Sequence, residues 1–329
     1  MLENLLRRSF IWAGLLVIGC AASSKIIPRD ERELCLALEE KGVEFSICYE
    51  GLNKNDLEQI ADVKQFAQAE FELLPSPNYL TFKDPPRTLH ILIVTSSTSS
   101  PLDPYTSADY NTVGNHCDLS FPPLRVVSEV DDLKDEEDCY KQKGYDVFLR
   151  ETSNIGNGSN INRTFMRHSW TNRASLIIHE DLHNTDDQNG KGNMDTMLKE
   201  SRAQWVGLIG AKEYFRFRGD WKNYQAAAQE YNRWVNYSGQ VNSAIESIDK
   251  LHKSNDPDIT EKERKILESV SSGMTKPALM GEYPYTKYFL IIDQVYGKLN
   301  KNHKAMMEVI LNTPNNKDEA MSYLQSKLK

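Results

Sequence analysis

The sequence predicts an α+β fold, in which a small mixed α/β part with a short sheet precedes a mainly helical part. Apolar runs rich in β-branched residues, the pattern of buried strands, lie in the first half of the chain, and the clearest spans residues 89–94. From Thr171 onward the apolar residues recur with helical periodicity. No internal repeat is present. We therefore expect a single domain over residues 31–329, mixed at 31–165 and helical at 166–329.

The N-terminal part is predicted to begin with amphipathic helix between residues 25 and 80. A run from Asp56 to Leu74 has apolar side chains at helical spacing, and Pro75 and Pro77 end it. Strands are then predicted at 89–94, 124–130 and 145–150, with a polar loop over residues 95–115.

The C-terminal part is predicted to consist of helices separated by breaks that contain glycine or proline. These helices span roughly residues 171–184, 195–217, 221–250, 260–272 and 285–311. The third of them carries an aromatic stripe, which is typical of core packing rather than of a ligand platform.

Composition and charge exclude one broad class of function. The chain has 329 residues, of which 40% are hydrophobic, and its net charge is −8. Basic residues are interleaved with acidic ones, and no block rich in lysine or arginine is present. A nucleic-acid-binding surface needs such a basic block or stripe, so we do not expect nucleic-acid binding.

The first twenty residues have the pattern of an export signal. Arg7 and Arg8 precede an apolar run at 10–18, which suits the hydrophobic region of a signal peptide better than a membrane-spanning helix. Gly19 followed by Cys20 resembles a bacterial lipobox, which predicts a lipoprotein signal peptide at 1–19, a lipid on Cys20 and a tether at 20–30. An ordinary secretory signal with an incidental cysteine is the alternative. Because Ala21 follows the cysteine, we expect lipid anchoring in the outer membrane, facing the periplasm.

The remaining four cysteines are candidates for disulfide bonds. An even number of cysteines in an oxidising compartment favours two disulfides. The pairing that is local in sequence is Cys35–Cys48 and Cys117–Cys139, although four cysteines allow three connectivities. Their spacing does not match a zinc ribbon.

The strongest chemical signal is the sequence His179-Glu180-Asp181-Leu182-His183 within the predicted helix at 171–184. Residues four apart lie one turn apart on the same face of a helix, so both imidazoles can reach one metal ion. Glu180 lies beside that face, where its carboxylate can contact a water on the metal. This arrangement is the HExxH motif of zinc metallopeptidases. The alternative is a pair of surface histidines on an amphipathic helix.

A catalytic zinc ion needs a third protein ligand, and the next helix offers one. Glu200 is its first glutamate and is followed at helical spacing by Ala203, Gly207 and Gly210. Small residues let two helix backbones approach closely, as a carboxylate must in order to reach a metal held by the preceding helix. Glu200 is therefore the predicted third ligand. The competing candidates are Asp186, Asp187 and Asp195.

These residues suggest a reaction. A single Zn²⁺ ion would acidify a bound water and polarise the scissile carbonyl, and Glu180 would accept the water proton and pass it to the leaving amine. The oxyanion of the tetrahedral intermediate needs a hydrogen-bond donor. The candidates for that catalytic role are Tyr283, Tyr285 and His168.

Several segments also resemble a known family. Residues 144–150 are similar to a strand with the sequence GYDVYLR, residues 178–183 are similar to an HELAH core, and residues 200–203 are similar to a helix that contains ESFA. Three earlier segments, 66–67, 74–79 and 89–96, resemble an N-terminal helix, the turn after it and a buried strand. Together they resemble the bacterial family of putative zinc aminopeptidases, gluzincin-like lipoproteins with HExxH and a downstream glutamate. The resemblance implies a zinc-dependent aminopeptidase, with the third ligand on the 200–203 helix and an extended substrate paired to residues 145–150.

The sequence thus favours a zinc metallopeptidase that hydrolyses peptide bonds in the cell envelope. The alternative is a non-catalytic, membrane-tethered lipoprotein with a degenerate or structural metal site. Aminopeptidase and endopeptidase activity both remain open, because an aminopeptidase needs a group that binds the free amine. Glu151 and Glu282 are the candidates for that group.

Overall fold

The computed structural model describes residues 54–80, 89–96, 98–100, 102, 124–127, 137–152, 161–254 and 256–329. Within these residues the fold is α+β, as predicted, with helices in large excess over strands. In chain order the elements are α3 (Lys54–Phe71), β1 (Leu89–Ser96), β2 (Leu124–Val127), β3 (Tyr145–Thr152), α6 (Arg163–Arg167), α7 (Trp170–Gln188), α8 (Thr196–Arg218), α9 (Trp221–Lys253), α10 (Ile259–Val270), α11 (Lys276–Thr286), α12 (Phe289–Lys298), α13 (His303–Asn312) and α14 (Lys317–Ser326).

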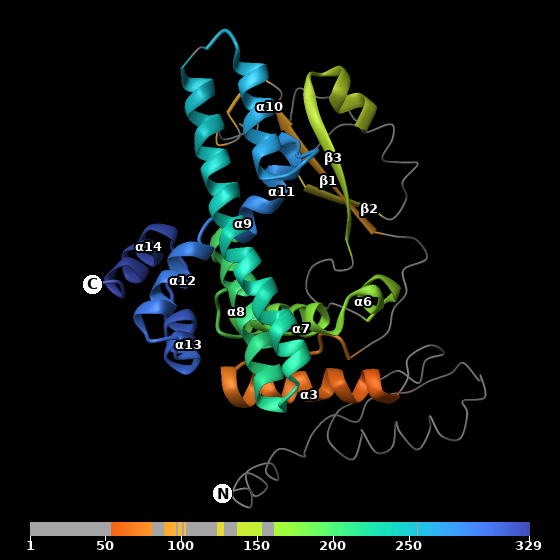
Figure 1. The fold of residues 1–329 in the computed structure, drawn as a ribbon, viewed down its shortest axis with the longest axis vertical. Coiled ribbons are helices and arrows are strands. Elements are labelled where there is room, and N and C mark those ends of the chain that lie inside the picture. Colours follow the sequence, from red (N-terminus) through yellow and green to blue (C-terminus); the bar gives the residue numbers. More distant parts are fainter. Residues whose placement is uncertain are drawn as a thin grey trace, which may run out of the picture.

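The described strands form one antiparallel sheet with the order β2-β1-β3. The register pairs Leu92 of β1 with Arg125 of β2 and Leu149 of β3. The three strands begin where the sequence predicts, but β1 and β3 each extend two residues farther, so Thr95 and Ser96 belong to a strand rather than to the predicted loop. Figure 1 shows the sheet on one side of the helices, with α12, α13 and α14 on the opposite side.

Helices α7 and α8 pack on each other near the centre of the molecule (Figure 1). They run in opposite directions, because Arg202 of α8 contacts Asp186 of α7 while the later Gly207 contacts the earlier His179. Each begins at a capping residue that satisfies a backbone N–H of the first turn: Ser169 accepts a hydrogen bond from Asn172 N, and Asp195 accepts one from Leu198 N. Gly219, in the left-handed region at φ 69°, ends α8. Both helices are predicted by sequence to within a few residues.

The largest hydrophobic core surrounds this pair. Apolar side chains from α3, α6 and α12–α14 pack on α7 and α8 around the fully buried Trp205. A second core lies at the far end of α9, where α9, α10 and α11 meet. Helix α11 connects this second core to the sheet, because Gly281 lies directly against Ile93 of β1. A Cβ at position 281 would overlap Cδ1 of Ile93, so a larger residue there would force the Ile93 side chain to shift.

Two features of the C-terminal helices differ from the prediction. Helix α11 was not predicted, because Pro277, Gly281 and Pro284 argue against a helix. Pro277 lies in the first turn, where the missing N–H has no intrahelical partner anyway, and Pro284 lies close to the end. The predicted helix at 285–311 is two helices, α12 and α13, separated at Asn300 and Lys301, which both have left-handed backbone (φ 55° and 56°).

Helix α14 was also not predicted. It begins at Asn316, whose side chain accepts hydrogen bonds from the backbone N–H groups of Asp318 and Glu319. Its buried residues, Ala320 and Leu324, lie four apart on one face and pack into the main core. Two apolar residues one turn apart, among charged residues, are too few to predict a helix from periodicity.

Several predictions fall on residues outside the described ranges. These are the signal peptide at 1–19, the tether at 20–30, the lipid on Cys20 and the cysteines at 35, 48 and 117. Cys139 lies in a short helical stretch at 137–142 and takes part in a disulfide, but its proposed pairing with Cys117 stays a prediction. Among the helices that the structure describes, none combines the length and the apolar character that a membrane span requires.

Candidate metal centre

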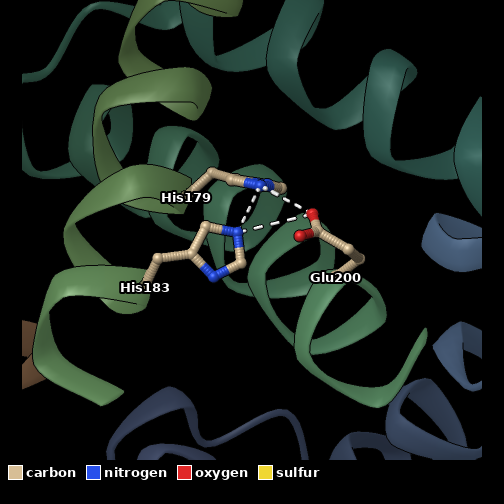
Figure 2. Close-up of side chains that lie close together, drawn as sticks. All are labelled: His179, His183 and Glu200. Atoms are coloured by element: carbon tan, nitrogen blue, oxygen red, sulfur yellow. Dashed lines mark hydrogen bonds and ion pairs between the residues drawn. The ribbon is translucent and has the colours of Figure 1, made fainter. Parts of the chain in front are cut away.

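Three side chains from the two central helices converge on one point (Figure 2). Glu200 Oε2 of α8 lies 3.4 Å from the Nε2 atom of His179 and 3.4 Å from the Nε2 atom of His183, both on α7. The two Nε2 atoms are 3.0 Å apart. Within the described residues, this is the group of three histidine and acidic side chains that could hold a metal ion.

The helical spacing of the histidines produces this arrangement. His179 and His183 lie one turn apart on the same face of α7, and their ring centroids are 4.8 Å apart with an interplanar angle of 80°. The rings are therefore edge to face, and each directs Nε2 toward Glu200 (Figure 2). His179 is buried, whereas His183 and Glu200 are half-buried, so the site is partly exposed.

The carboxylate reaches the histidines because α7 and α8 approach closely at two glycines, as the sequence predicts. A Cβ at position 207 would lie 2.6 Å from the carbonyl oxygen of Ser175 and 3.2 Å from Cβ of His179. A Cβ at position 210 would lie 2.8 Å from Cδ1 of Ile178. At position 207 the contact is with the backbone and leaves no room for a Cβ, whereas at position 210 a Cβ would force the Ile178 side chain to shift.

The three competing aspartates have other partners. Asp186 is fully buried and forms a two-pronged ion pair with Arg202 of α8, at 2.8 and 3.1 Å. Asp187 pairs with Lys199 at 2.9 Å, and Asp195 caps α8. The two ion pairs lie on either side of Glu200 in the sequence, and they hold α8 against the end of α7. Their role is therefore to fix the helices that carry the site.

The charge of Glu200 is stabilised by the two imidazoles. Burial by itself would raise the pKa of Glu200, but hydrogen bonds from His179 and His183 outweigh burial and lower that pKa well below its usual range. The carboxylate is thus ionised at neutral pH and is available as a ligand. In the described residues, His183 Nδ1 is buried without a hydrogen-bond partner, so its ring orientation depends on packing and on its Nε2 contacts.

The donor set and two of its three separations suit a zinc ion, whereas the third, the 3.0 Å between the two Nε2 atoms, is shorter than ideal. Two imidazole nitrogens and one carboxylate oxygen are a known ligand set for catalytic zinc, which keeps a fourth position open. Two ligand atoms at about 2.0–2.1 Å from a tetrahedral zinc ion lie about 3.3–3.4 Å from each other. The separation of Glu200 Oε2 from each imidazole nitrogen is 3.4 Å.

Glu180, the predicted base, is half-buried beside His179 on α7. Its backbone carbonyl accepts a hydrogen bond from Asn78 Nδ2 at 2.8 Å. The next residue, Asp181, is buried and binds Lys64 of α3, with Lys64 Nζ 2.7 Å from Asp181 Oδ1. Asn78 was named from the sequence only as part of the family-like segment 74–79, without a role, and Lys64 was not singled out, because a lone lysine carries no pattern.

The two candidate tyrosines occupy different places. The ring of Tyr285 lies 6.3 Å from that of His179, measured between centroids, at an interplanar angle of 42°. Tyr283 is buried in the second core with Leu279 and Val241, and burial, helped by nearby carboxylates, raises the pKa of its hydroxyl to about 12. Tyr285 is thus the candidate whose ring lies near His179, whereas Tyr283 lies in the second core, and a catalytic role for either tyrosine stays a prediction.

Ser201, which belongs to the family-like segment 200–203 but had no predicted role, fixes α11 relative to Glu200. Its hydroxyl donates to the carbonyl of Pro284 at 2.7 Å and accepts from the backbone N–H of Tyr288 at 3.1 Å. Because Ser201 follows Glu200 directly, this contact ties the position of Tyr285 to the metal site. His168 ends α6 and accepts a hydrogen bond from Arg173 Nε through its carbonyl, and no described contact joins it to the three convergent residues.

A comparison with models of protein families gives one match. The family described as "Putative aminopeptidase" matches residues 49–276, more than half of the chain. The matched range contains His179, Glu180, His183 and Glu200, and it ends at the start of α11, before Tyr285. Searches of curated proteins and of solved structures found no match.

Proposed function

We propose that this chain, which belongs to the "Putative aminopeptidase" family, is a zinc-dependent peptidase whose metal ion is held by His179, His183 and Glu200. The observation that supports the proposal best is the equal distance of 3.4 Å from Glu200 Oε2 to the two imidazole nitrogens. These three side chains come from two helices that specific contacts hold together, and their spacing suits a tetrahedral metal ion with an open position.

The chemistry follows from the residues around that position. Zn²⁺, when bound, would polarise the scissile carbonyl and lower the pKa of a water. Glu180 accepts the proton of the attacking water and passes it to the nitrogen of the leaving amine. Tyr285 is the described tyrosine whose ring lies near His179, and its hydroxyl donates a hydrogen bond to the oxyanion that forms on the substrate.

The sheet suggests how a peptide substrate would lie. Strand β3 forms one edge of the three-stranded sheet, and α11, which carries Tyr285, packs on both β1 and β3. An extended peptide can add to such an edge through backbone hydrogen bonds. We therefore propose a peptide bound along β3, with its scissile bond near the metal.

The proposed location is the cell envelope. The export signal at 1–19 and the lipobox cysteine Cys20 are sequence features that lie outside the described residues. They support a protein anchored by lipid in the outer membrane and facing the periplasm, with peptides as its substrates. This part of the proposal is tested by labelling cells with palmitate and measuring its incorporation into the wild-type protein and into a Cys20→Ser variant. The wild-type protein should be labelled and the variant should not.

The peptidase activity is tested with Glu180→Gln, because the amide keeps the shape of the side chain and loses the base. The zinc content of the purified protein and its cleavage of a peptide library are measured together. We expect about one zinc ion per chain in both proteins and a fall in kcat of about 10²–10⁴-fold in the variant. Glu268→Gln, at an exposed site on α10, is the control.

The result also decides between the two classes of function. A protein without zinc and without cleavage in its wild-type form would be a tethered binding protein, and the enzymatic proposal would be wrong. The same library with free and with acetylated N-termini separates aminopeptidase from endopeptidase activity. An aminopeptidase cleaves only the free peptides.

A further inference from the structure

A segment that follows α3 lies along α7 without regular secondary structure and has an unusual backbone. Residues 72–80 contain two non-glycine residues in the left-handed region, Glu72 at φ 55° and Tyr79 at φ 56°. Such backbone costs on the order of 1–3 kcal/mol per residue and persists only where the surroundings hold it. Tyr79 is fully buried and its ring stacks on Phe165 at 4.5 Å. The shape of this segment is therefore imposed by its contacts.

Those contacts follow one face of α7 over about two turns. The backbone N–H of Leu74 donates a hydrogen bond to Thr185 Oγ1 at 2.9 Å. The carbonyl of Pro75 accepts hydrogen bonds from Asn184 Nδ2 at 3.2 Å and from Gln188 Nε2 at 3.1 Å. Ser76 Oγ donates a hydrogen bond to the carboxylate of Asp181, and Asn78 Nδ2 donates one to the carbonyl of Glu180 at 2.8 Å. Every one of these partners lies within the part of α7 that begins at the proposed base.

A buried ion pair sits in the middle of this series. Lys64 Nζ lies 2.7 and 2.9 Å from the two carboxylate oxygens of Asp181 and 3.0 Å from Ser76 Oγ, and all three side chains are almost fully buried. A buried ion pair is rarely more stable than two apolar residues of the same volume. Its directional hydrogen bonds instead favour one orientation of the groups that it joins. Here it joins α3, the 72–80 segment and the residue next to Glu180.

We propose that residues 72–80, the brace, set the rotation of α7 and that Asn78 is a positioning residue for Glu180. Asn78 holds the peptide group between Glu180 and Asp181, and the Lys64–Asp181 pair holds the side chain that follows it. The proposal rests on the proposed peptidase function. A displacement of about 1 Å in a reacting group can reduce a rate by about 10²-fold, so a small rotation of α7 would be visible in kcat.

Two variants of Asn78 and one matched control test the proposal. Asn78→Ala removes the side chain, and Asn78→Asp keeps its volume but replaces the donor with an oxygen. Gln188→Ala removes a contact to the same brace, at Pro75, two turns away from Glu180. We expect both Asn78 variants to lower kcat at least about 10-fold with KM and zinc content unchanged, and Gln188→Ala to stay within about twofold of wild type.

A merely structural role predicts a different result. If the brace only stabilised the fold, the Asn78 and Gln188 variants would lower Tm while kcat of the folded enzyme stayed the same, and the proposal would be wrong. A Lys64→Met/Asp181→Leu double variant replaces the ion pair with an apolar pair of similar volume, so that no buried charge is left unpaired and the protein can still fold. It is expected to fold and to show the same fall in kcat.

Hydrogen exchange provides a readout that needs neither metal nor activity. The proposal expects faster exchange of the backbone amides at 180–184 in both Asn78 variants and not in Gln188→Ala. If the wild-type protein cleaves no peptide, the proposed function fails, and the exchange pattern still decides whether the brace holds α7. Equal exchange rates in all the variants would contradict the proposed role of the brace.

Discussion

Gly207 of α8 faces His179 of α7 so closely that a Cβ on the glycine would lie 3.2 Å from Cβ of the histidine. This contact explains how a carboxylate on one helix reaches two imidazoles on another. Gly207 lies about two turns after Glu200 on α8, and the close approach there brings α8 near enough to α7 for the Glu200 carboxylate to reach the histidines. The site thus depends on a residue that has no chemistry of its own.

We expect Gly207→Ala to weaken metal binding and to destabilise the protein by about 1–3 kcal/mol, the usual cost of overpacking. The new methyl group would lie 2.6 Å from a backbone oxygen, which cannot move without shifting α7. Zinc titration and urea unfolding measure the two effects. Gly239→Ala on α9, with its nearest neighbour at 4.0 Å, is the control and should be neutral or stabilising by up to about 1 kcal/mol. Equal behaviour of the two variants would contradict this explanation.

Removal of the metal should lower stability by mass action. At a free zinc concentration of 100 times Kd, binding adds about 2.7 kcal/mol to the free energy of unfolding. We expect a chelator to lower Tm of the wild-type protein and added zinc to restore it. Glu200→Gln keeps the volume of the side chain but removes the anionic ligand, so its Tm should respond much less to zinc. A full response of Glu200→Gln would show that the ion is bound elsewhere.

Replacement of Tyr285 by phenylalanine tests the donor to the oxyanion. Loss of one such donor typically reduces kcat by about 10²–10³-fold, and we expect a change of that size with little change in KM. The matched control is Tyr283→Phe, two residues away on the same helix, since Tyr283 is buried in the second core. Steady-state kinetics on one peptide substrate distinguishes the two. If both variants kept wild-type kcat, the donor would be another group.

The Asp186–Arg202 ion pair should be among the most sensitive points of the fold. Both side chains are fully buried, and Arg202 also donates to the carbonyl of Ile310. Asp186→Ala leaves a buried guanidinium without its carboxylate, which costs about 3–5 kcal/mol. The exposed Glu261–Arg264 pair provides the comparison, since water screens this pair and Glu261→Ala should cost far less stability than Asp186→Ala. Urea unfolding of both variants measures the difference, and a small loss in Asp186→Ala would refute the role of the buried pair.

The helices and strands with a clear periodicity or a clear local signal, such as a capping residue, could be predicted from the sequence. Helices α7, α8 and α9 are long and well capped, and β1 is an apolar run of β-branched residues. Helix α11 could not be read in this way. Its two prolines and its glycine count against a helix locally, but they are tolerated because one proline lies in the first turn and the glycine packs on Ile93. Tertiary packing outweighed local propensity there.

The sequence by itself determined which residues are the candidates for the metal centre. The spacing of His179, Glu180 and His183 places two imidazoles on one helical face, and the small residues after Glu200 allow a second helix to approach. Only the tertiary structure decided which acid completes the group and which tyrosine lies beside it. Asp186, Asp187 and Asp195 carry the same carboxylate group as Glu200, and Tyr283 carries the same hydroxyl group as Tyr285. These residues are distinguished by contacts with residues that lie far away in the sequence, and no local sequence pattern predicts those contacts.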